Sequence, residues 1–409
     1  MIYNSPYKVE NSPEIINTLS KDKGIIIFGT GNFGQIVLSA LKKVGLKALY
    51  FCDNNEKNWN KTWGGLKVLS HAQLSENYSD NPVLIASLSN RYIKKQLKKL
   101  NIKKIYDVDF IFSNINLDLE KCGTNWSARR CKEQIDSYVF ATNAEKFSKD
   151  KLRVKHLDLV LTEKCSLKCK DCSNLMQYYA KPIDEDYDVL IYSLDQFMNN
   201  VDFVNEVRLI GGEPLIYKKI DQVMEKILTY NNFEKIFVYT NGTIVPKGNR
   251  LNAFKNEKVL FKISDYGKIS RNVKKLEETL GKTNINYITE RITTWQNCAL
   301  IKPFDRSEEL TKHIYGNCCV NQFLTLLHGK LYLCPFQAHA ENLNAIPKAP
   351  KDSIDLKTTN GNVKNKIHDL YYGKDYLEAC KSCNGRDPNV SSVDAAIQTQ
   401  DPLQYKVIS

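Results

Sequence analysis

Three closely spaced cysteines are the residues of this sequence best suited to chemistry. Cys165, Cys169 and Cys172 form a C-x3-C-x2-C run directly after the apolar, strand-like stretch 156–161. Iron–sulfur clusters need soft thiolate ligands, and three thiolates can hold three irons of a [4Fe–4S] cluster. Because no fourth cysteine is near in the sequence, one iron would stay open to a substrate or cofactor. A zinc site, which usually takes four ligands, fits the triplet poorly.

A second motif lies at the end of a later predicted strand. Gly211, Gly212, Glu213 and Pro214 follow the strand 206–210. Two glycines expose backbone groups at the carboxyl edge of a strand, where parallel barrels place their sites. The triplet and this turn, in this order, resemble the radical S-adenosylmethionine (radical SAM) enzymes. The resemblance implies that the open iron chelates S-adenosylmethionine, that an electron from the cluster cleaves it to a 5′-deoxyadenosyl radical, and that the glycine turn binds the methionine amino group.

Polar residues also end the next two predicted strands. By the same resemblance, Asn241, Ser264 and Asp265 are candidates for contacts to the cofactor's carboxylate and ribose. Capping and turn formation are the alternative roles of such residues. The chain departs from the family at Asp171, where many members carry an aromatic residue before the third cysteine. The adenine contact is therefore expected from elsewhere.

A second cysteine set lies nearer the carboxyl end of the chain. Its members are Cys318, Cys319, Cys334, Cys380 and Cys383. Two apolar stretches around residues 328–329 predict a tight β-hairpin that delivers Cys334 close to Cys318 or Cys319. Four thiolates close a site, which suits an auxiliary [4Fe–4S] cluster or a structural zinc ion. The order resembles the twitch domain, a shortened SPASM domain that carries an auxiliary cluster. The choice between Cys318 and Cys319 stays open.

The first hundred residues read as a nucleotide-binding α/β unit. Gly29, Gly31 and Gly34 form G-x-G-x-x-G between a strand and an amphipathic helix, and Asp53 ends the next strand. Such glycines permit a tight turn and close approach to phosphate at a helix N-terminus, and the acid takes ribose hydroxyls. The alternative is a Rossmann-like turn that binds nothing. The unit resembles small Rossmann-like domains of bacterial sugar-modifying enzymes, which often bind a nucleotide-sugar.

Alternating strand and helix patterns set the expected organisation, an α/β protein with parallel sheets. The predicted domains are a Rossmann-like domain (1–115), a helical connector (116–152), a partial (β/α)6 radical SAM barrel (153–300) and a small twitch-like domain with a β-hairpin (301–409). Predicted strands of the first domain are 25–28, 48–52, 82–88 and 104–108. Predicted strands of the barrel are 156–162, 206–210, 235–239, 259–264 and 285–289, and its predicted helices are 186–199, 217–230 and 271–281.

Composition and charge indicate the cellular compartment and the classes of partner that we expect for the protein. The absence of an 18-residue apolar run argues against a membrane span, and a cytoplasmic chain keeps clustered thiols for metal rather than disulfides. The net charge is +12, yet no nucleic-acid motif appears. The lysine-rich stretch 92–104 has helical apolar spacing and reads as a solvated helix face. Docking of an acidic partner there is the weaker alternative. The family's usual electron donor would be a flavodoxin or ferredoxin.

The resemblance extends to enzymes with a single auxiliary cluster that act on aminoglycosides, and to chains found beside polysaccharide genes. It implies hydrogen abstraction from a sugar, aminocyclitol or nucleotide-sugar, with oxidation, dehydration or epimerisation as the outcome. In an oxidation, the auxiliary cluster would accept the second electron. One rival is a peptide-modifying radical SAM maturase. A rival of another class is a non-catalytic nucleotide-binding protein whose cysteines hold structural zinc.

Overall fold

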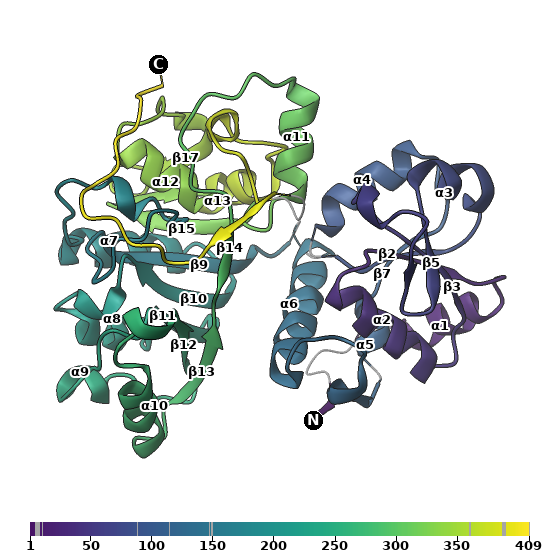
Figure 1. Ribbon diagram of the computed structural model, residues 1–409, viewed down its shortest axis with the longest axis horizontal. Coiled ribbons are helices and arrows are strands. Elements are labelled where there is room, and N and C mark those ends of the chain that lie inside the picture. Colours follow the sequence, from purple (N-terminus) through teal and green to yellow (C-terminus); the bar gives the residue numbers. More distant parts are fainter. Residues whose placement is uncertain are drawn as a thin grey trace. The chain divides into compact units, whose positions relative to one another are not determined.

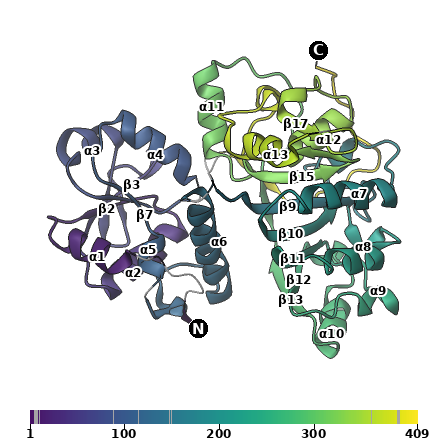
Figure 2. The same cartoon turned by 180° about the vertical axis from the view of Figure 1, so that it is seen from behind.

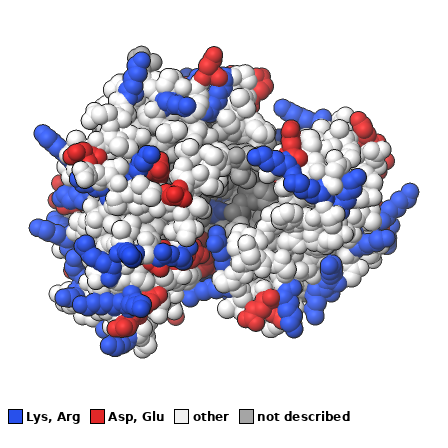
Figure 3. Space-filling view, in the orientation of Figure 1, with Lys and Arg blue, Asp and Glu red and all other residues white. Residues whose placement is uncertain are grey.

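The computed structural model describes residues 1–409 except 5–8, 10, 88, 114, 147, 149, 360, 387–389 and 409. The chain divides into two compact units, Met1–Phe147 and Ser148–Ser409. Each unit carries its own sheet and its own helices (Figure 1). No helix among the described residues is long and apolar enough to cross a membrane. Lys and Arg side chains are scattered over both units on the face drawn in Figure 3.

The first unit is a six-stranded sheet in the order β4-β5-β3-β2-β6-β7. All its pairings are parallel except that of β4 with β5. The sheet strands are β2 (Ile25–Phe28), β3 (Ala48–Cys52), β4 (Thr62–Trp63), β5 (Leu66–Leu69), β6 (Val83–Ile85) and β7 (Ile105–Asp107). A separate pair joins β1 (Ile2–Tyr3) to β8 (Leu117–Asp118). The four predicted strands are confirmed, although β6 is shorter than predicted, and Leu88 lies outside the described residues.

Helices cover both faces of this sheet, as a parallel sheet requires. The helices are α1 (Ser12–Ser20), α2 (Asn32–Lys43), α3 (His71–Tyr78), α4 (Asn90–Lys99), α5 (Asp109–Phe112) and α6 (Ala128–Lys146). Side chains from α2, α5 and α6 share one apolar core, and side chains from α3 and α4 share the other. Because Ile135 and Tyr138 of α6 are buried in the first core, the structure makes the predicted connector part of this unit. In the lysine-rich helix α4, Ile93 and Leu97 face the core.

The second unit is built on an eight-stranded sheet in the order β13-β12-β11-β10-β9-β15-β16-β17. The first six strands of this order pair in parallel, and the last two pairings, β15 with β16 and β16 with β17, are antiparallel. The strands are β9 (Arg153–Thr162), β10 (Phe203–Gly211), β11 (Phe233–Thr240), β12 (Val259–Asp265), β13 (Asn286–Arg291), β15 (Phe323–Leu327), β16 (Lys330–Tyr332) and β17 (Ser353–Asp355). Within the described chain β13 and β17 do not pair with each other, so the sheet is an open, partial barrel. The five predicted barrel strands are confirmed.

The two faces of this sheet differ in polarity. The helices of the unit are α7 (Tyr187–Met198), α8 (Ile220–Ile227), α9 (Asn249–Asn252), α10 (Val273–Lys282), α11 (Glu308–Asn317), α12 (Pro335–Asn342) and α13 (Val363–Tyr372). Helices such as α7 and α8 lie over the apolar face, to whose core β9 contributes Leu157, Leu159 and Leu161, whereas α12 packs against Val160 on the other face (Figure 2). Alternate residues such as Asp158 and Arg208 face the other side and meet there at 3.0 Å. A parallel sheet buried on both faces is normally apolar throughout, so the charged face indicates a place for a ligand.

The predicted hairpin is present as β15 and β16, with His328 and Gly329 in its turn. Both turn residues have positive φ, 49° and 78°, as a two-residue turn of the favoured hairpin type requires. Since β15 pairs in parallel with β9, the sheet runs without interruption across the predicted domain boundary at residue 300. A further pair, β14 (Thr294–Gln296) with β18 (Ser392–Asp394), brings the carboxyl-terminal segment back to the unit.

Candidate functional site

The cysteine triplet lies in the loop that follows β9, at the carboxyl edge of the sheet. Cys165, Cys169 and Cys172 all line one cavity of about 260 Å³. Burial raises the pKa of each thiol, that of Cys169 to about 11. A thiol binds metal as the thiolate, so occupation by metal must drive the loss of these protons. Soft donors on three sides of one cavity fit an iron–sulfur cluster, in which each thiolate takes a different iron.

The carboxyl-terminal segment covers the cysteine loop. The amide nitrogen of Lys170 donates to the carbonyl of Ile397 at 2.7 Å, and that of Thr399 donates to Lys168 at 2.7 Å. The Gln398 side chain donates from Nε2 to the Cys169 sulfur at 3.2 Å. Nothing in the sequence pattern points to this contact, because the two segments are more than 220 residues apart. The contact gives the loop a fixed position that its own few residues would not supply.

The glycine turn after β10 packs directly on the start of the cysteine loop. A Cβ on Gly211 would lie 2.3 Å from the carbonyl oxygen of Thr162, and one on Gly212 would lie 2.2 Å from that of Lys164. The amide of Gly212 donates to Thr162 at 2.9 Å, and that of Glu213 donates to Lys164 at 2.9 Å. Any side chain would push the two loops apart, so both glycines are needed for the approach. Both also line the cavity.

Glu213 and Pro214 are buried beneath the cavity and are not among the residues that line it. The Glu213 carboxyl accepts hydrogen bonds from the Asn241 amide (2.8 Å), the Thr240 hydroxyl (3.0 Å) and the Leu215 amide (3.2 Å). Burial raises its pKa to about 7, against the pull of these three donors. Glu213 therefore ties the end of β11 to the glycine turn. A contact from its side chain to a ligand stays a prediction.

Of the polar residues at the next strand ends, Asn241 and Ser264 line the cavity. The Asn241 side chain lies 3.6 Å from the Cys165 sulfur and donates to the Ser166 hydroxyl at 3.1 Å. Asp265 is not among the residues that line the cavity. Its carboxylate accepts from the Gly267 amide at 2.8 Å and pairs with Arg291 at 3.1 Å. The structure thus brings two of the three predicted residues to the cavity wall and gives the third a turn-forming role.

An aromatic pair supplies a flat wall that sequence reasoning did not locate. Tyr266 and Trp295 both line the cavity, and their rings meet edge to face at 5.5 Å and 84°. They pack against a small apolar cluster of Leu167, Cys169 and Ala396, which Cys165 and Cys172 also contact. Trp295 is held by the pairing of β14 with β18. Many family members use an aromatic residue at the position of Asp171 to contact adenine. In this chain, Tyr266 and Trp295 can supply that aromatic surface instead. The sequence offered one indication of this aromatic wall, because Tyr266 directly follows Asp265, a residue already predicted to lie at the site.

A charged patch lies on the sheet face inside the same cavity. Its members are Asp158, Arg208 and Arg386, and the rings of Tyr239 and Phe323 flank Arg208 at 4.7 Å and 4.6 Å. Sequence reasoning missed all of them. The available signal was the alternation of charged with apolar residues in the strands 156–161 and 206–210, which is unusual for a parallel strand.

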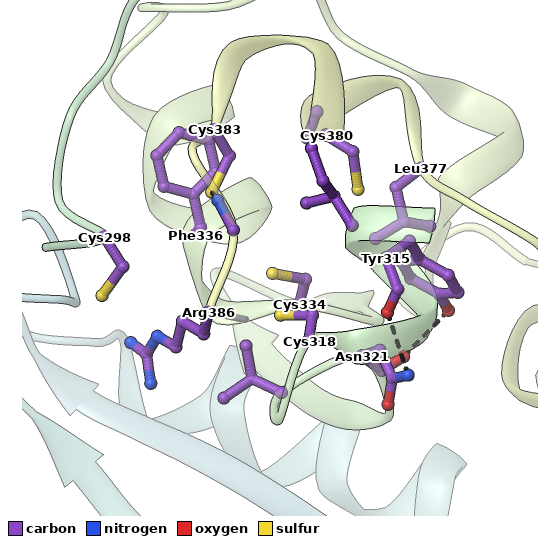
Figure 4. Close-up of a pocket in the computed structure, with 14 residues that line it drawn as sticks. Cys298, Tyr315, Cys318, Asn321, Cys334, Phe336, Leu377, Cys380, Cys383 and Arg386 are labelled. Carbon is purple, nitrogen blue, oxygen red and sulfur yellow. Dashed lines mark hydrogen bonds between the residues drawn. The ribbon is translucent and has the colours of Figure 1, made fainter. Parts of the chain in front are cut away.

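The second cysteine set surrounds a small, enclosed and largely apolar cavity of about 30 Å³. Cys318, Cys334, Cys380 and Cys383 line it, together with Cys298, which the sequence pattern had not assigned (Figure 4). Cys319 is exposed and is not among the lining residues. The structure therefore favours Cys318 over Cys319 as the member of the set. Among the described residues, no three His, Cys, Asp or Glu side chains are already gathered as ligands of a single metal ion.

In the first unit, the glycine-rich turn has the predicted strand-to-helix position. A Cβ on Gly34 would lie 2.1 Å from the Gly29 carbonyl oxygen, so Gly34 is needed for close packing of α2 on the turn. Gly31 precedes α2 and faces open space. The Asp53 carboxylate instead accepts from the Thr30 amide at 2.7 Å, the Thr30 hydroxyl at 2.6 Å and the Asn55 amide at 2.7 Å. Asp53 thus holds the turn in shape, and its contact to a ribose stays a prediction.

Comparisons with known proteins found one family model and several relatives. The family model described as "C2185-like, N-terminal" matches residues 21–106. The chain is 31% identical over 96 residues to a GTP 3′,8-cyclase of Desulforamulus reducens, which covers 22% of this chain and 28% of that protein. It is 32% identical over 98 residues to molybdenum cofactor biosynthesis protein 1 of Dictyostelium discoideum, covering 22% and 15%. The chain thus spans less than a third of the length of these two relatives.

The triplet, the glycine turn and the two strand-end residues share one cavity, and these sequence matches support the radical SAM superfamily for this chain. Among solved structures, the chain is similar to BtrN in complex with AdoMet and 2-DOIA. That match has 16% identity and a TM-score of 0.38, and it covers 62% of this chain and 98% of that one.

Proposed function

We propose that this radical SAM protein is an enzyme that holds a [4Fe–4S] cluster on Cys165, Cys169 and Cys172 and binds S-adenosylmethionine at the open iron. With both bound, the cluster supplies an electron that cleaves the cofactor and yields a radical able to abstract hydrogen. The observation that carries the proposal is the shared cavity, in which the three thiols meet the backbone of Gly211 and Gly212. This convergence supports a cluster with a bound cofactor over a zinc site or an ordinary turn.

The chain's own residues have distinct parts in this proposal. Gly211 and Gly212 bring backbone groups to the cavity wall for the amino acid portion of the cofactor, while Asn241 and Ser264 offer polar side chains. Tyr266 and Trp295 form an apolar wall suited to a purine ring. Burial of these groups excludes water from a reactive intermediate and orients one C–H bond of the substrate.

We further propose that Cys318, Cys334, Cys380 and Cys383 hold an auxiliary [4Fe–4S] cluster. Their enclosed apolar surroundings support a fully ligated site rather than one that binds a substrate. Such a cluster can accept the second electron in the oxidation of an alcohol. A flavodoxin or ferredoxin is the proposed donor of the first electron.

For the substrate, the proposal is a sugar, aminocyclitol or nucleotide-sugar. The charged and aromatic side chains on the cavity side of the sheet support a polar ligand with many hydroxyl groups. A peptide-modifying maturase and a zinc-holding nucleotide-binding protein are the rivals. The zinc rival predicts zinc in the purified protein and no cofactor cleavage.

One experiment tests the core of the proposal. The protein is purified without oxygen, its metals are measured, and it is incubated with S-adenosylmethionine and dithionite. We expect roughly eight irons per chain, by the four-iron stoichiometry of two clusters, and formation of 5′-deoxyadenosine. Zinc in place of iron, or iron without cleavage, would refute the proposed function.

For the first unit, we propose that the glycine-rich turn binds a phosphate-bearing ligand, more readily a nucleotide-sugar than NAD. The open space at Gly31 before α2 supports approach of a phosphate to free amide groups. Gly31→Val places a branched side chain there and should weaken nucleotide-sugar binding without changing iron content. Calorimetry of the full chain with several nucleotide-sugars and NAD measures this. Equal affinities for wild type and variant would leave the turn without that role.

A further inference from the structure

The large cavity is lined by more positively charged than negatively charged side chains. Among the described residues, two arginines, Arg208 and Arg386, face one carboxylate, Asp158. The Arg208 Nε lies 3.0 Å from an Asp158 carboxylate oxygen. Burial raises the pKa of Asp158, and the positive charges of Arg208 and Arg386 oppose that rise. Arg208 also has Glu206 as a negative neighbour, and Arg386 lies near the thiols of the second cysteine set. At the wall of the large cavity itself, two guanidinium groups stand against one carboxylate.

The hydrogen-bonding capacity of Arg208 is not fully used. Arg208 is nine-tenths buried, and its Nε contacts Asp158 without the geometry of a hydrogen bond. Figure 4 shows the Arg386 guanidinium pointing away from Cys334 and Cys380. A buried N–H group without an acceptor is costly unless a ligand satisfies it.

We propose that Arg208 and Arg386 bind a phosphate group of the substrate, so that the radical acts on a phosphorylated sugar or cyclitol. This inference rests on the proposed function and names its substrate class. Each guanidinium offers five N–H groups in a planar fork that matches oxyanions. A carboxylate has two oxygens and one charge, which a single fork satisfies. Two forks around one cavity suit the three oxygens and double charge of a phosphate, with Asp158 orienting Arg208.

The arrangement also places the reacting group. Arg208 sits on β10, three residues before Gly211, and Arg386 lines both the large cavity and the small one with the second cysteine set. A phosphate held there anchors the substrate at the sheet face. Its ring then extends toward the cysteine triplet on the same cavity wall. Anchoring of this kind fixes one C–H bond against the cofactor, which is the contribution that positioning makes to catalysis.

The test is equilibrium dialysis of the iron-loaded full-length protein, saturated with S-adenosylmethionine, against radiolabelled glucose 1-phosphate and inorganic phosphate. Glucuronate and glucose serve as the carboxylate and neutral probes. We expect saturable binding of the phosphate probes and none of glucose. Arg208→Gln and Arg386→Gln should each weaken binding about 10- to 100-fold, the usual cost of a charged hydrogen-bond pair. Arg271→Gln, which removes one exposed charge elsewhere in the unit, is the matched control and should bind as wild type does.

Three results would overturn the inference: no saturable binding of either phosphate probe, equal binding by wild type and both variants, or arginine-dependent preference for glucuronate. The second would place phosphate elsewhere, such as the glycine-rich turn. If a Gln variant loses iron, Arg208→Lys and Arg386→Lys keep the charge without the fork, and intermediate affinities are then expected. Cleavage of S-adenosylmethionine by the wild type is measured in parallel. If S-adenosylmethionine is cleaved but phosphate binding does not depend on the arginines, only this inference is refuted. If phosphate binding depends on the arginines but S-adenosylmethionine is not cleaved, only the proposed cofactor chemistry is refuted.

Discussion

The two cysteine sites of the second unit are built on opposite principles. The triplet Cys165, Cys169 and Cys172 occupies one short loop and opens into a cavity of about 260 Å³ with polar and charged walls. The second set gathers cysteines from separate segments around an enclosed cavity of about 30 Å³ with mostly apolar walls. The first cavity leaves room for a ligand beside the thiols, and the second, much smaller cavity does not.

This difference teaches how one fold separates two uses of the same ligand chemistry. A short loop can donate three thiolates and leave a coordination position free, because the surrounding strand ends supply other contacts. Cysteines from distant segments close a site and at the same time connect those segments. Under the proposed auxiliary cluster, metal binding at the second site would therefore be coupled to folding of the chain around it, whereas the first site would lose its metal without losing the sheet.

The largest expected effect comes from removing the open site. Replacing Cys165, Cys169 and Cys172 by Ala should abolish 5′-deoxyadenosine formation, because no thiolate then holds the cofactor-binding iron. About half of the iron should remain, since the second set has its own ligands. Iron analysis and chromatography of the products measure both. Cleavage above background in the triple variant would mean that the site is wrongly assigned.

The converse change should separate folding from cleavage. Cys380→Ala with Cys383→Ala removes two thiols from the closed site and should lower the unfolding temperature of the protein, because metal and fold are coupled there. Cofactor cleavage without substrate should persist in the soluble fraction. Calorimetry and iron analysis provide the readouts. Full iron content and normal product yield together would contradict the auxiliary cluster.

A matched pair of neighbours tests the lining of the closed site. Cys318 lines the cavity and Cys319 is exposed, so Cys318→Ala should lose the iron of the second cluster and Cys319→Ala should keep it. The two variants differ by one position and remove the same atom. Electron paramagnetic resonance of the reduced proteins counts the clusters. The opposite pattern would show that metal loading rearranges this segment and that Cys319 is the ligand.

A smaller effect should follow from loosening the cover of the open site. Gln398→Leu removes the side-chain donor to the Cys169 sulfur, a bond of 3.2 Å. A hydrogen bond to a charged acceptor contributes about 1.5–3 kcal/mol, so iron should leave the first site roughly tenfold faster or more under a chelator. Gln400→Leu, an exposed neighbour, is the control and should release iron at the wild-type rate. Equal rates of iron release by Gln398→Leu and Gln400→Leu would show that the Gln398 contact does not stabilise the first site.

The sequence could predict those features of the fold and the site that depend on residues close together in the chain. Four strands of the first sheet, five strands of the second and the hairpin turn at 328–329 came from local periodicity and turn chemistry, and the structure confirms them. The short strands β4, β5 and β17 were not predicted. The cysteine triplet and glycine turn could be predicted because their spacing is local. Arg386, Trp295 and Gln398 could not, because each reaches the cavity through tertiary packing of segments distant in sequence. The hydrogen bonds of Asp53 to Thr30 could not be predicted for the same reason, since they depend on how the turn folds back.

The smallest expected effect concerns the link between the two sites. His328, in the turn of the hairpin that delivers Cys334, lies 2.9 Å from a Glu163 oxygen and 3.1 Å from a Glu185 oxygen. Glu163 is two residues before Cys165. Burial opposes the charge on His328, but hydrogen bonds from the imidazole to both carboxylates outweigh it and raise its pKa to about 9. The protonated histidine thus ties the hairpin to the strand that carries the open site.

The sign of the pH effect follows from that raised pKa. A histidine whose pKa rises from 6.5 to about 9 on folding stabilises the fold fully below pH 6.5, and the contribution is lost as pH rises through 9. His328→Asn keeps a residue that tolerates the positive φ of the turn but removes the charge. The variant should be less stable than wild type by about 2 kcal/mol at pH 6, after allowance for the partly exposed ring. That difference should shrink toward zero at pH 10. A difference in unfolding free energy that stays constant across this range would show that His328 acts through packing and that its charge does not couple the two sites.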